Sequence, residues 1–332
     1  MRPCMLEVLT GMVLARGVLI LWNRAILVEA ARQLPEWVKR PARAVGLTSG
    51  MRRLVGYKAF EVFGALGDKE WLATIEGSLT KSTWNGIALP GFPSAQLQIA
   101  TVGAANEQTL RQAGAFYLLV RDACRDHGRL LKHNSQVLDF GIGWGRIVRY
   151  FLRDVDPNGL HGVDVSEELM GEARNTGCPA ALRKVEPLGA LPYPDNTFDV
   201  VYAYSVFTHL PEHTQDLWLA EIKRTLKLGG VFVATVESPR LIPQRLMIDT
   251  ADERQHPRER WIARNLKSNP AIAASLEASG FAYIGSPEST YGDTMMTEGY
   301  VREHWGRYFE VLRLIDEPDA WQVPVIMRKS AP

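Results

Sequence analysis

The chain has few cysteines, no long apolar run and almost no net charge, and each absence excludes a class of protein. Three cysteines in 332 residues share no metal-like spacing, and an odd number does not suit a disulfide framework. Lys plus Arg number 38 against 37 Asp plus Glu, so the net charge is +1. Such a balance gives no electrostatic basis for nucleic acid as the main partner. One pair of the seven histidines, His209 and His213, has an HxxxH spacing, but no further metal-like pattern accompanies it, and we expect no bound metal.

The first 53 residues combine an apolar segment with a basic linker. Residues 8–28 are mostly apolar, but Arg16, Asn23 and Arg24 interrupt them before the roughly 20 apolar residues of a membrane span are reached. Arg16 and Asn23 share one helical face, which predicts an amphipathic helix. The alternatives for this helix are packing on the domain or a partner subunit, peripheral membrane contact, and an upstream extension outside the functional protein. We expect a cytoplasmic protein, with peripheral membrane contact as the alternative.

Residues 54–106 form a second segment of mixed character. Residues 54–80 predict one or two short helices, interrupted near Gly64 and Gly67. Residues 82–106 are rich in Gly, Pro, Ser and Asn, and they predict a long irregular connection, which is uncommon in a domain unless it is functional. This connection is either a lid on the substrate side or a packed structural arm.

From residue 107 to 332, predicted helices and strands alternate, as in an α/β doubly wound sheet. A helix over 107–127 has an apolar stripe, and a helix over 212–227 is expected to stop at Gly229-Gly230. The tail predicts a surface helix over 253–264 and a short helix over 271–279 that ends at Gly280. An insertion over 281–305 follows, above the active face. The predicted strands are a buried strand that begins at Val137, then 160–164, 181–185, 198–204 and 231–236, and an antiparallel pair over 308–315 and 322–327.

Glycines recur at alternate positions where the first strand turns towards a helix. Asp139 closes the strand, and Gly141, Gly143 and Gly145 follow as a GxGxG loop. Positions without a side chain let the backbone bend sharply and let a ligand lie against it. A dinucleotide loop has its third glycine one residue later. Asp164 closes the next strand, where an acid can accept hydrogen bonds from both ribose hydroxyls, so these residues predict a site for a nucleoside-bearing cofactor.

Four ordered blocks of sequence, at 138–146, 162–166, 191–210 and 218–230, resemble those of class I S-adenosylmethionine-dependent methyltransferases. The resemblance covers roughly residues 110–236. It implies a seven-stranded sheet with an antiparallel C-terminal strand, here preceded by a mainly helical extension. It also implies S-adenosylmethionine as the cofactor, with Asp139 and the glycines at its methionine end and Asp164 at its ribose. The expected cofactor-binding residues are Asp139, Phe140, Gly141, Gly143, Trp144, Gly145, Arg146, Asp164, Val165 and Ser205. The adenine contact stays unassigned, because residues 183–187 lack an obvious Asp or Asn.

Two residues of the loop have more than one predicted role. Trp144 either covers the cofactor or packs on the following helix. Arg146 points back either to Asp139 or to the carboxylate of the cofactor.

His209 is the best candidate for a general base, because it follows the fourth strand at the active end of the sheet. The alternative is that it caps or packs the next helix. Tyr204 and Ser205 are candidates for lining the path of the methyl group, and Tyr291 and His304 of the insertion are weaker candidates for catalysis.

The function that these residues predict is methyl transfer to an oxygen or nitrogen of a small molecule, sugar or glycan. Two alternatives remain open from the sequence. One is a noncatalytic cofactor-binding or scaffold protein. The other is a nicotinamide-dependent oxidoreductase, which the early third glycine argues against. The oligomeric state is also open.

Overall fold

The computed structural model describes residues 62–318 and 320–331, and these belong to one unit of the chain, Gly56–Pro332. The predicted amphipathic helix and basic linker of residues 1–53 lie outside the described residues. Among the helices that are described, none is long and apolar enough to cross a membrane.

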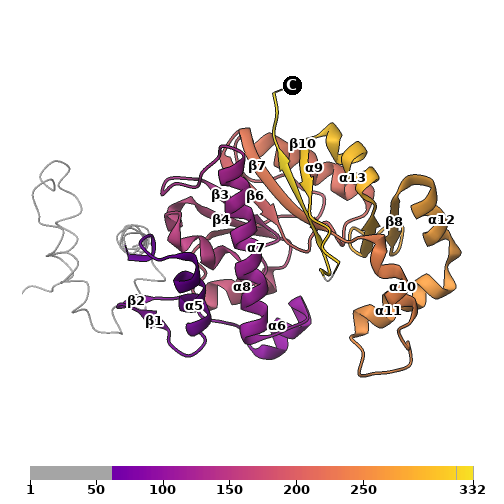
Figure 1. Ribbon diagram of the computed structural model, residues 1–332, viewed down its shortest axis with the longest axis horizontal. Helices are drawn as coiled ribbons and strands as arrows, with labels where there is room; N and C mark the ends of the chain where they lie inside the picture. The colour runs from indigo at the N-terminus through magenta and orange to yellow at the C-terminus, as the bar shows by residue number, and fades with distance from the viewer. Residues whose placement is uncertain (1–61, 319, 332) are drawn as a thin grey trace, which may run out of the picture. The chain divides into compact units, whose positions relative to one another are not determined.

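The centre of the described unit is a seven-stranded sheet with the order β10-β11-β7-β6-β3-β4-β5 (Figure 1). Five strands are parallel, and β11 pairs antiparallel with β7 on one side and with β10 on the other. This confirms the predicted doubly wound sheet and its antiparallel C-terminal strand. The strands are β3 (Val137–Phe140), β4 (Leu160–Asp164), β5 (Ala181–Lys184), β6 (Phe198–Ala203), β7 (Leu226–Val236), β10 (Glu310–Leu314) and β11 (Val323–Arg328).

Each face of the sheet has its own apolar core, because successive strand residues point to opposite faces. Along β6, Val200 and Tyr202 join the core that contains α7 (Asn106–Asp126). Val201 and Ala203 join the core that contains α9 (Glu212–Thr225). The predicted apolar stripe of α7 is buried, and Figure 1 shows this helix crossing in front of the sheet.

One predicted boundary near the sheet was wrong, and the helix predicted after the glycine loop is a 3₁₀ helix. This helix, Val148–Arg153, begins after Gly145, which still has a left-handed φ of 81°. The helix α9 ends at Thr225, and β7 begins directly at Leu226. Gly229 and Gly230 therefore lie within β7, where the register with β6 shifts and both pair with the backbone of Lys329.

The segment before α7 is more regular than its composition predicts. After α5 (Asp68–Gly77), the expected irregular connection contains a hairpin of β1 (Thr83–Trp84) and β2 (Ile87–Ala88), and then α6 (Ala95–Val102). The hairpin turns at Asn85-Gly86, both with positive φ, which is a turn signal that composition alone obscures. Ser94 caps the start of α6 and left-handed Gly103 ends it.

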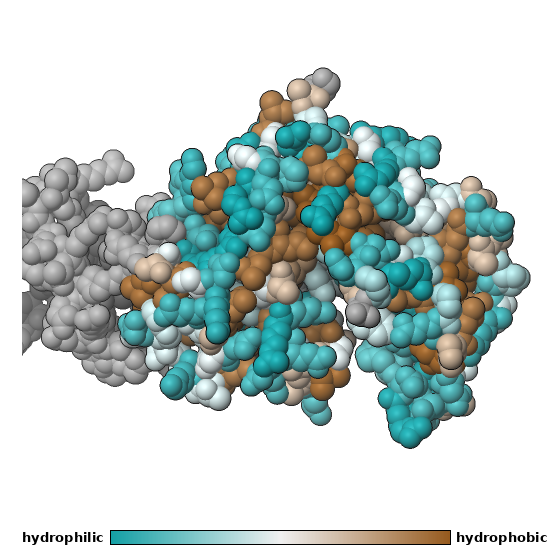
Figure 2. Space-filling view, in the orientation of Figure 1, coloured by the Kyte–Doolittle hydropathy of each residue, from teal (hydrophilic) through white to brown (hydrophobic). Residues whose placement is uncertain are grey.

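A lobe follows β7 before the chain returns to the sheet. It contains α10 (Ile242–Leu246), α11 (Pro257–Ser268), α12 (Pro270–Ser279), the two-stranded sheet of β8 (Phe281–Ile284) and β9 (Asp293–Met296), and α13 (Glu298–His304). Gly280 ends α12 as predicted, whereas α11 begins later than predicted, because His256 caps it and Pro257 is its first residue. Figure 2 shows apolar residues at the surface around α12, in agreement with the exposed alanines of that helix.

Candidate functional site

The glycine loop lies at the carboxyl edge of the sheet, between the ends of β3 and β4. The backbone N–H groups of Gly141 and Ile142 donate to the carbonyl of Val163, at 2.9 and 3.0 Å. All three loop glycines have positive φ, which favours glycine at each. A Cβ on Gly141 would lie 2.3 Å from the side chain of Val206, and one on Gly145 would lie 2.7 Å from the sulfur of Cys178. A Cβ on Gly143 would meet no atom within 4 Å, so Gly143 borders open space.

Asp164 closes β4 beside this open space. Its Oδ2 accepts from the backbone N–H of Gly143 and its Oδ1 from that of Ser166, both at 2.8 Å. Burial raises the pKa of Asp164, and these backbone donors oppose that rise. A carboxylate has about four acceptor positions, so Asp164 retains acceptor capacity beside these backbone donors. This geometry fits a ribose diol, whose two hydroxyls are the donors the cofactor would present.

Asp139 lies beneath the loop and accepts a hydrogen bond from the Tyr202 hydroxyl at 2.8 Å. Its side chain is buried, and burial raises the pKa of the carboxyl to about 8; the charge of Asp164 adds to that rise. A cation placed beside Asp139 would favour its ionised form. The contact with the methionine end of the cofactor stays a prediction.

Arg146 anchors the loop to α7. Its Nη1 donates to Gln112 Oε1 at 2.6 Å and to the carbonyl of Thr109 at 3.3 Å, and its guanidinium lies 5.0 Å from the Tyr204 ring centroid. No hydrogen bond joins it to Asp139 in the described structure, although its positive charge acts on that carboxyl. Of the two predicted partners of Arg146, Asp139 is therefore affected only by the charge of the guanidinium, without a hydrogen bond.

The remaining loop residues are placed by packing. Trp144 is buried and lies edge-on to Phe92, with ring centroids 6.4 Å apart, and 5.2 Å from the Arg149 guanidinium. It therefore packs on the segment before α7 as well as on the turn that follows the loop. The Phe140 side chain packs on Trp218 in the core beside α9, so its backbone is the part that faces the loop. Val165 is exposed.

Ser205 follows β6 at the same edge, with a φ of 58°. Its backbone N–H donates to Thr235 Oγ1 at 2.7 Å, and its hydroxyl accepts from Gln322 Nε2 at 2.8 Å. The sequence analysis did not identify Gln322 as a partner of Ser205, because the two residues are 117 positions apart and no local pattern relates them.

His209 lies in the same loop after β6, in contact with the predicted insertion. Its Nδ1 is 2.8 Å from the carbonyl oxygen of Gly292 and 3.4 Å from Asp293 Oδ1, and its ring stacks on Tyr291 at 4.7 Å. The structure thus joins two of the predicted candidates, His209 and Tyr291. It also adds Asp293, which sequence reasoning had not assigned a role.

His304 lies elsewhere. Its Nε2 is 2.6 Å from Asp216 Oδ1 of α9, and its ring stacks on Tyr300 of α13. This candidate therefore belongs to the contact between two helices. Within the described residues, no three His, Cys, Asp or Glu side chains gather as a metal site.

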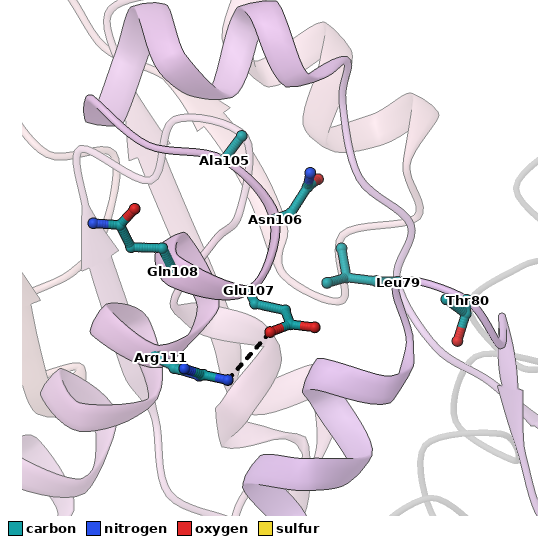
Figure 3. A pocket seen from close by; sticks show the side chains of 7 residues that line it. All are labelled: Leu79, Thr80, Ala105, Asn106, Glu107, Gln108 and Arg111. Carbon is teal, nitrogen blue, oxygen red and sulfur yellow. Dashed lines mark hydrogen bonds and ion pairs between the residues drawn. The ribbon is translucent and has the colours of Figure 1, made fainter.

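A surface hollow of about 690 Å³ lies beside the start of α7 (Figure 3). It is lined by residues after α5 and at the start of α7, where Glu107 and Arg111 form an ion pair. None of its lining residues belongs to the predicted cofactor site. Its lining residues are Leu79, Thr80, Ala105, Asn106, Glu107, Gln108 and Arg111.

Sheet order, glycine loop and Asp164 together define a doubly wound α/β domain with a site for a nucleoside-bearing cofactor. A family model described as a methyltransferase domain matches residues 138–234. Residues 138–234 thus match a methyltransferase domain, for which the fold and the loop imply S-adenosylmethionine as the cofactor. The open space at Gly143 and the free acceptor capacity of Asp164 fit that cofactor.

Curated relatives match part of the chain. The probable methyltransferase ltbC of Aspergillus luteorubrus is 31% identical over 112 residues, which cover 30% of this chain and 39% of that protein. The 2-methyl-6-phytyl-1,4-hydroquinone methyltransferase of Synechocystis is 29% identical over 164 residues, 45% of this chain and 47% of that protein. The matches thus span less than half the length of these relatives.

Among solved structures, an S-adenosylmethionine-dependent methyltransferase from Clostridium acetobutylicum covers 71% of this chain and 98% of its own. Its TM-score is 0.46 at 14% identity.

Proposed function

We propose that this protein transfers the methyl group of S-adenosylmethionine to an oxygen or nitrogen of a small-molecule or glycan acceptor. The observation that carries the proposal is the placement at one sheet edge of the glycine loop, the Asp164 carboxylate and the loop containing His209. The adjacent strands β4, β3 and β6 end at this edge, so they present a cofactor site beside a candidate base.

Bound S-adenosylmethionine supplies a methyl group already activated by its positive sulfur. The task of the chain is to hold the acceptor in line with that group and to exclude water. Asp164 and the loop backbone at Gly143 would hold the nucleoside end. His209 would take the proton that a hydroxyl acceptor loses, at the ring nitrogen that does not face Gly292.

The curated relatives favour a small molecule over a glycan. They include proteins named as methyltransferases of a phytyl hydroquinone, of a sterol and of a fatty acid. Because carbon methyltransferases are among them, the acceptor atom has to be established by product analysis.

The experiment that tests the proposal is calorimetric titration of the full chain with S-adenosylmethionine and, separately, with NADH. We expect micromolar binding of the first and none of the second. Incubation with hydroxylated small molecules should then release S-adenosylhomocysteine, and mass spectrometry should locate the added methyl. Binding of NADH alone would favour the oxidoreductase. Binding of S-adenosylmethionine without turnover across a broad acceptor panel would favour the noncatalytic alternative.

A further inference from the structure

We propose that Asp293 and Arg258 are positioning residues that set the protonation form and charge environment of His209 from the lobe after β7. This inference rests on the proposed function, in which His209 is the base. It concerns a cluster of side chains that no sequence motif identifies.

The tautomer of His209 follows from its partner. The carbonyl oxygen of Gly292 can only accept, so Nδ1, at 2.8 Å, has to donate and carry the hydrogen. In the neutral ring, Nε2 then has a free lone pair, as a base requires.

Backbone contacts fix this arrangement. The N–H of Gly292 donates to the carbonyl of His209, and the N–H of Thr294 donates to that of Thr208, both at 2.8 Å. The Thr294 hydroxyl also donates to the carbonyl of Phe207 at 2.9 Å. The start of β9 therefore pairs with the loop after β6, and it cannot shift without moving His209.

Tyr291 sets the accessible side of the ring. Its ring stacks on that of His209 with an interplanar angle of 17°, and it remains 65% exposed. One face of the imidazole is therefore covered by an aromatic ring. With Nδ1 bonded to Gly292, the Nε2 edge is left for an acceptor.

Asp293 supplies the charge next to the ring. Its carboxyl is buried, and Oδ1 lies 3.4 Å from His209 Nδ1. The same oxygen accepts from Arg258 Nε at 2.7 Å and also contacts Arg258 Nη2. The negative charge of Asp293 favours a hydrogen at His209 Nδ1, whereas Arg258 offsets part of that charge, so the two residues act with opposite sign.

Arg258 is itself held by a buried network. Its Nη2 donates to Glu237 Oε2 at 3.1 Å, directly after β7. Glu237 also forms an ion pair with Arg245, which donates to Glu259 at 2.9 Å. With its carboxylates ionised, this cluster has three negative and two positive charges. Proton uptake by His209 would balance it, which suits a group that gains a proton during the reaction.

The titratable and charged groups around His209 are therefore Tyr291 and Asp293 of the insertion, with Arg258 and Glu237 behind Asp293. Asp164 acts on Tyr291 through its charge, which connects this cluster electrostatically to the predicted ribose site.

The test is nitrogen-detected NMR of the full chain with ¹⁵N-labelled histidine, with the His209 signals assigned by His209→Gln. We expect the Nδ1–H tautomer at neutral pH. Asp293→Asn should raise the fraction of the Nε2–H tautomer of His209 severalfold, and Arg258→Gln should lower that fraction by a smaller factor. Arg254→Gln is the matched control. Arg254 belongs to the same lobe, is exposed and bonds to Asp252, so the tautomer ratio of His209 should not change.

Opposite shifts in the two variants support the proposal, because a merely structural role would not give them. A predominant Nε2–H tautomer in the wild-type chain, or an unchanged tautomer ratio in Asp293→Asn, would overturn it. If Asp293→Asn fails to fold, Arg258→Gln still tests the sign. Calorimetry with S-adenosylmethionine on the same samples separates the proposed function from the positioning role. If the wild-type chain does not bind S-adenosylmethionine, the proposed function fails, whereas the NMR result decides the positioning role.

Discussion

Replacing Gly143 with valine should abolish cofactor binding while the protein stays folded. Gly143 has a φ of 52°, and a Cβ there would project into open space without touching any atom within 4 Å. The side chain would therefore not clash within the protein but would fill space that the cofactor needs. The backbone N–H that donates to Asp164 would remain.

The cost to stability and the cost to binding can be separated. A non-glycine residue in the left-handed region costs about 1–2 kcal/mol. For a domain of this size, that corresponds to a fall in melting temperature of roughly 2–8 °C. Loss of close approach by the cofactor should weaken binding at least a hundredfold, which is about 2.7 kcal/mol.

Gly86→Val is the matched control, because Gly86 has a φ of 75° and an equally open Cβ direction but lies in the β1–β2 turn. Both variants should lose similar stability in thermal unfolding. In calorimetry with S-adenosylmethionine, the Gly86 variant should bind like the wild type. Binding by Gly143→Val within twofold of the wild type would show that the cofactor does not lie against this part of the loop.

Three further outcomes are expected. Asp164→Ala should weaken S-adenosylmethionine binding at least tenfold, about 1.4 kcal/mol, and unchanged affinity in calorimetry would exclude its ribose role. His209→Ala should lower turnover about a hundredfold to ten-thousandfold with unchanged cofactor affinity, whereas intact turnover would make it a structural residue. Asp139 has a pKa raised by burial from 3.8 to about 8, so the folded state retains a proton that the unfolded state has lost, and stability should fall as the pH rises from 4 to 8. Asp139→Asn should lack this component; identical slopes for both proteins in urea unfolding across this range would contradict the assignment.

Sequence reasoning located the sheet well because its signals are local. The strands are short apolar runs. The Ser166 side chain caps the start of the helix that follows it, and Gly280, which has no side chain, ends α12 in a left-handed conformation. It located helix ends less well where tertiary contacts compete. The glycines at 229 and 230 look like a helix stop, but pairing with Lys329 draws them into β7.

The predicted cofactor half of the site could be located from the sequence itself, because the conformation of the glycine loop and the position of Asp164 depend on local backbone and on the ends of adjacent strands. The candidate catalytic half was decided by the tertiary structure. His209 and Asp293 are far apart along the chain, as are Ser205 and Gln322, and each pair meets because segments from different parts of the fold reach the same edge of the sheet. Local sequence patterns describe neighbours along the chain. The partners of His209 depend on the pairing of β9 with the loop after β6, which is a long-range contact that only the folded chain makes.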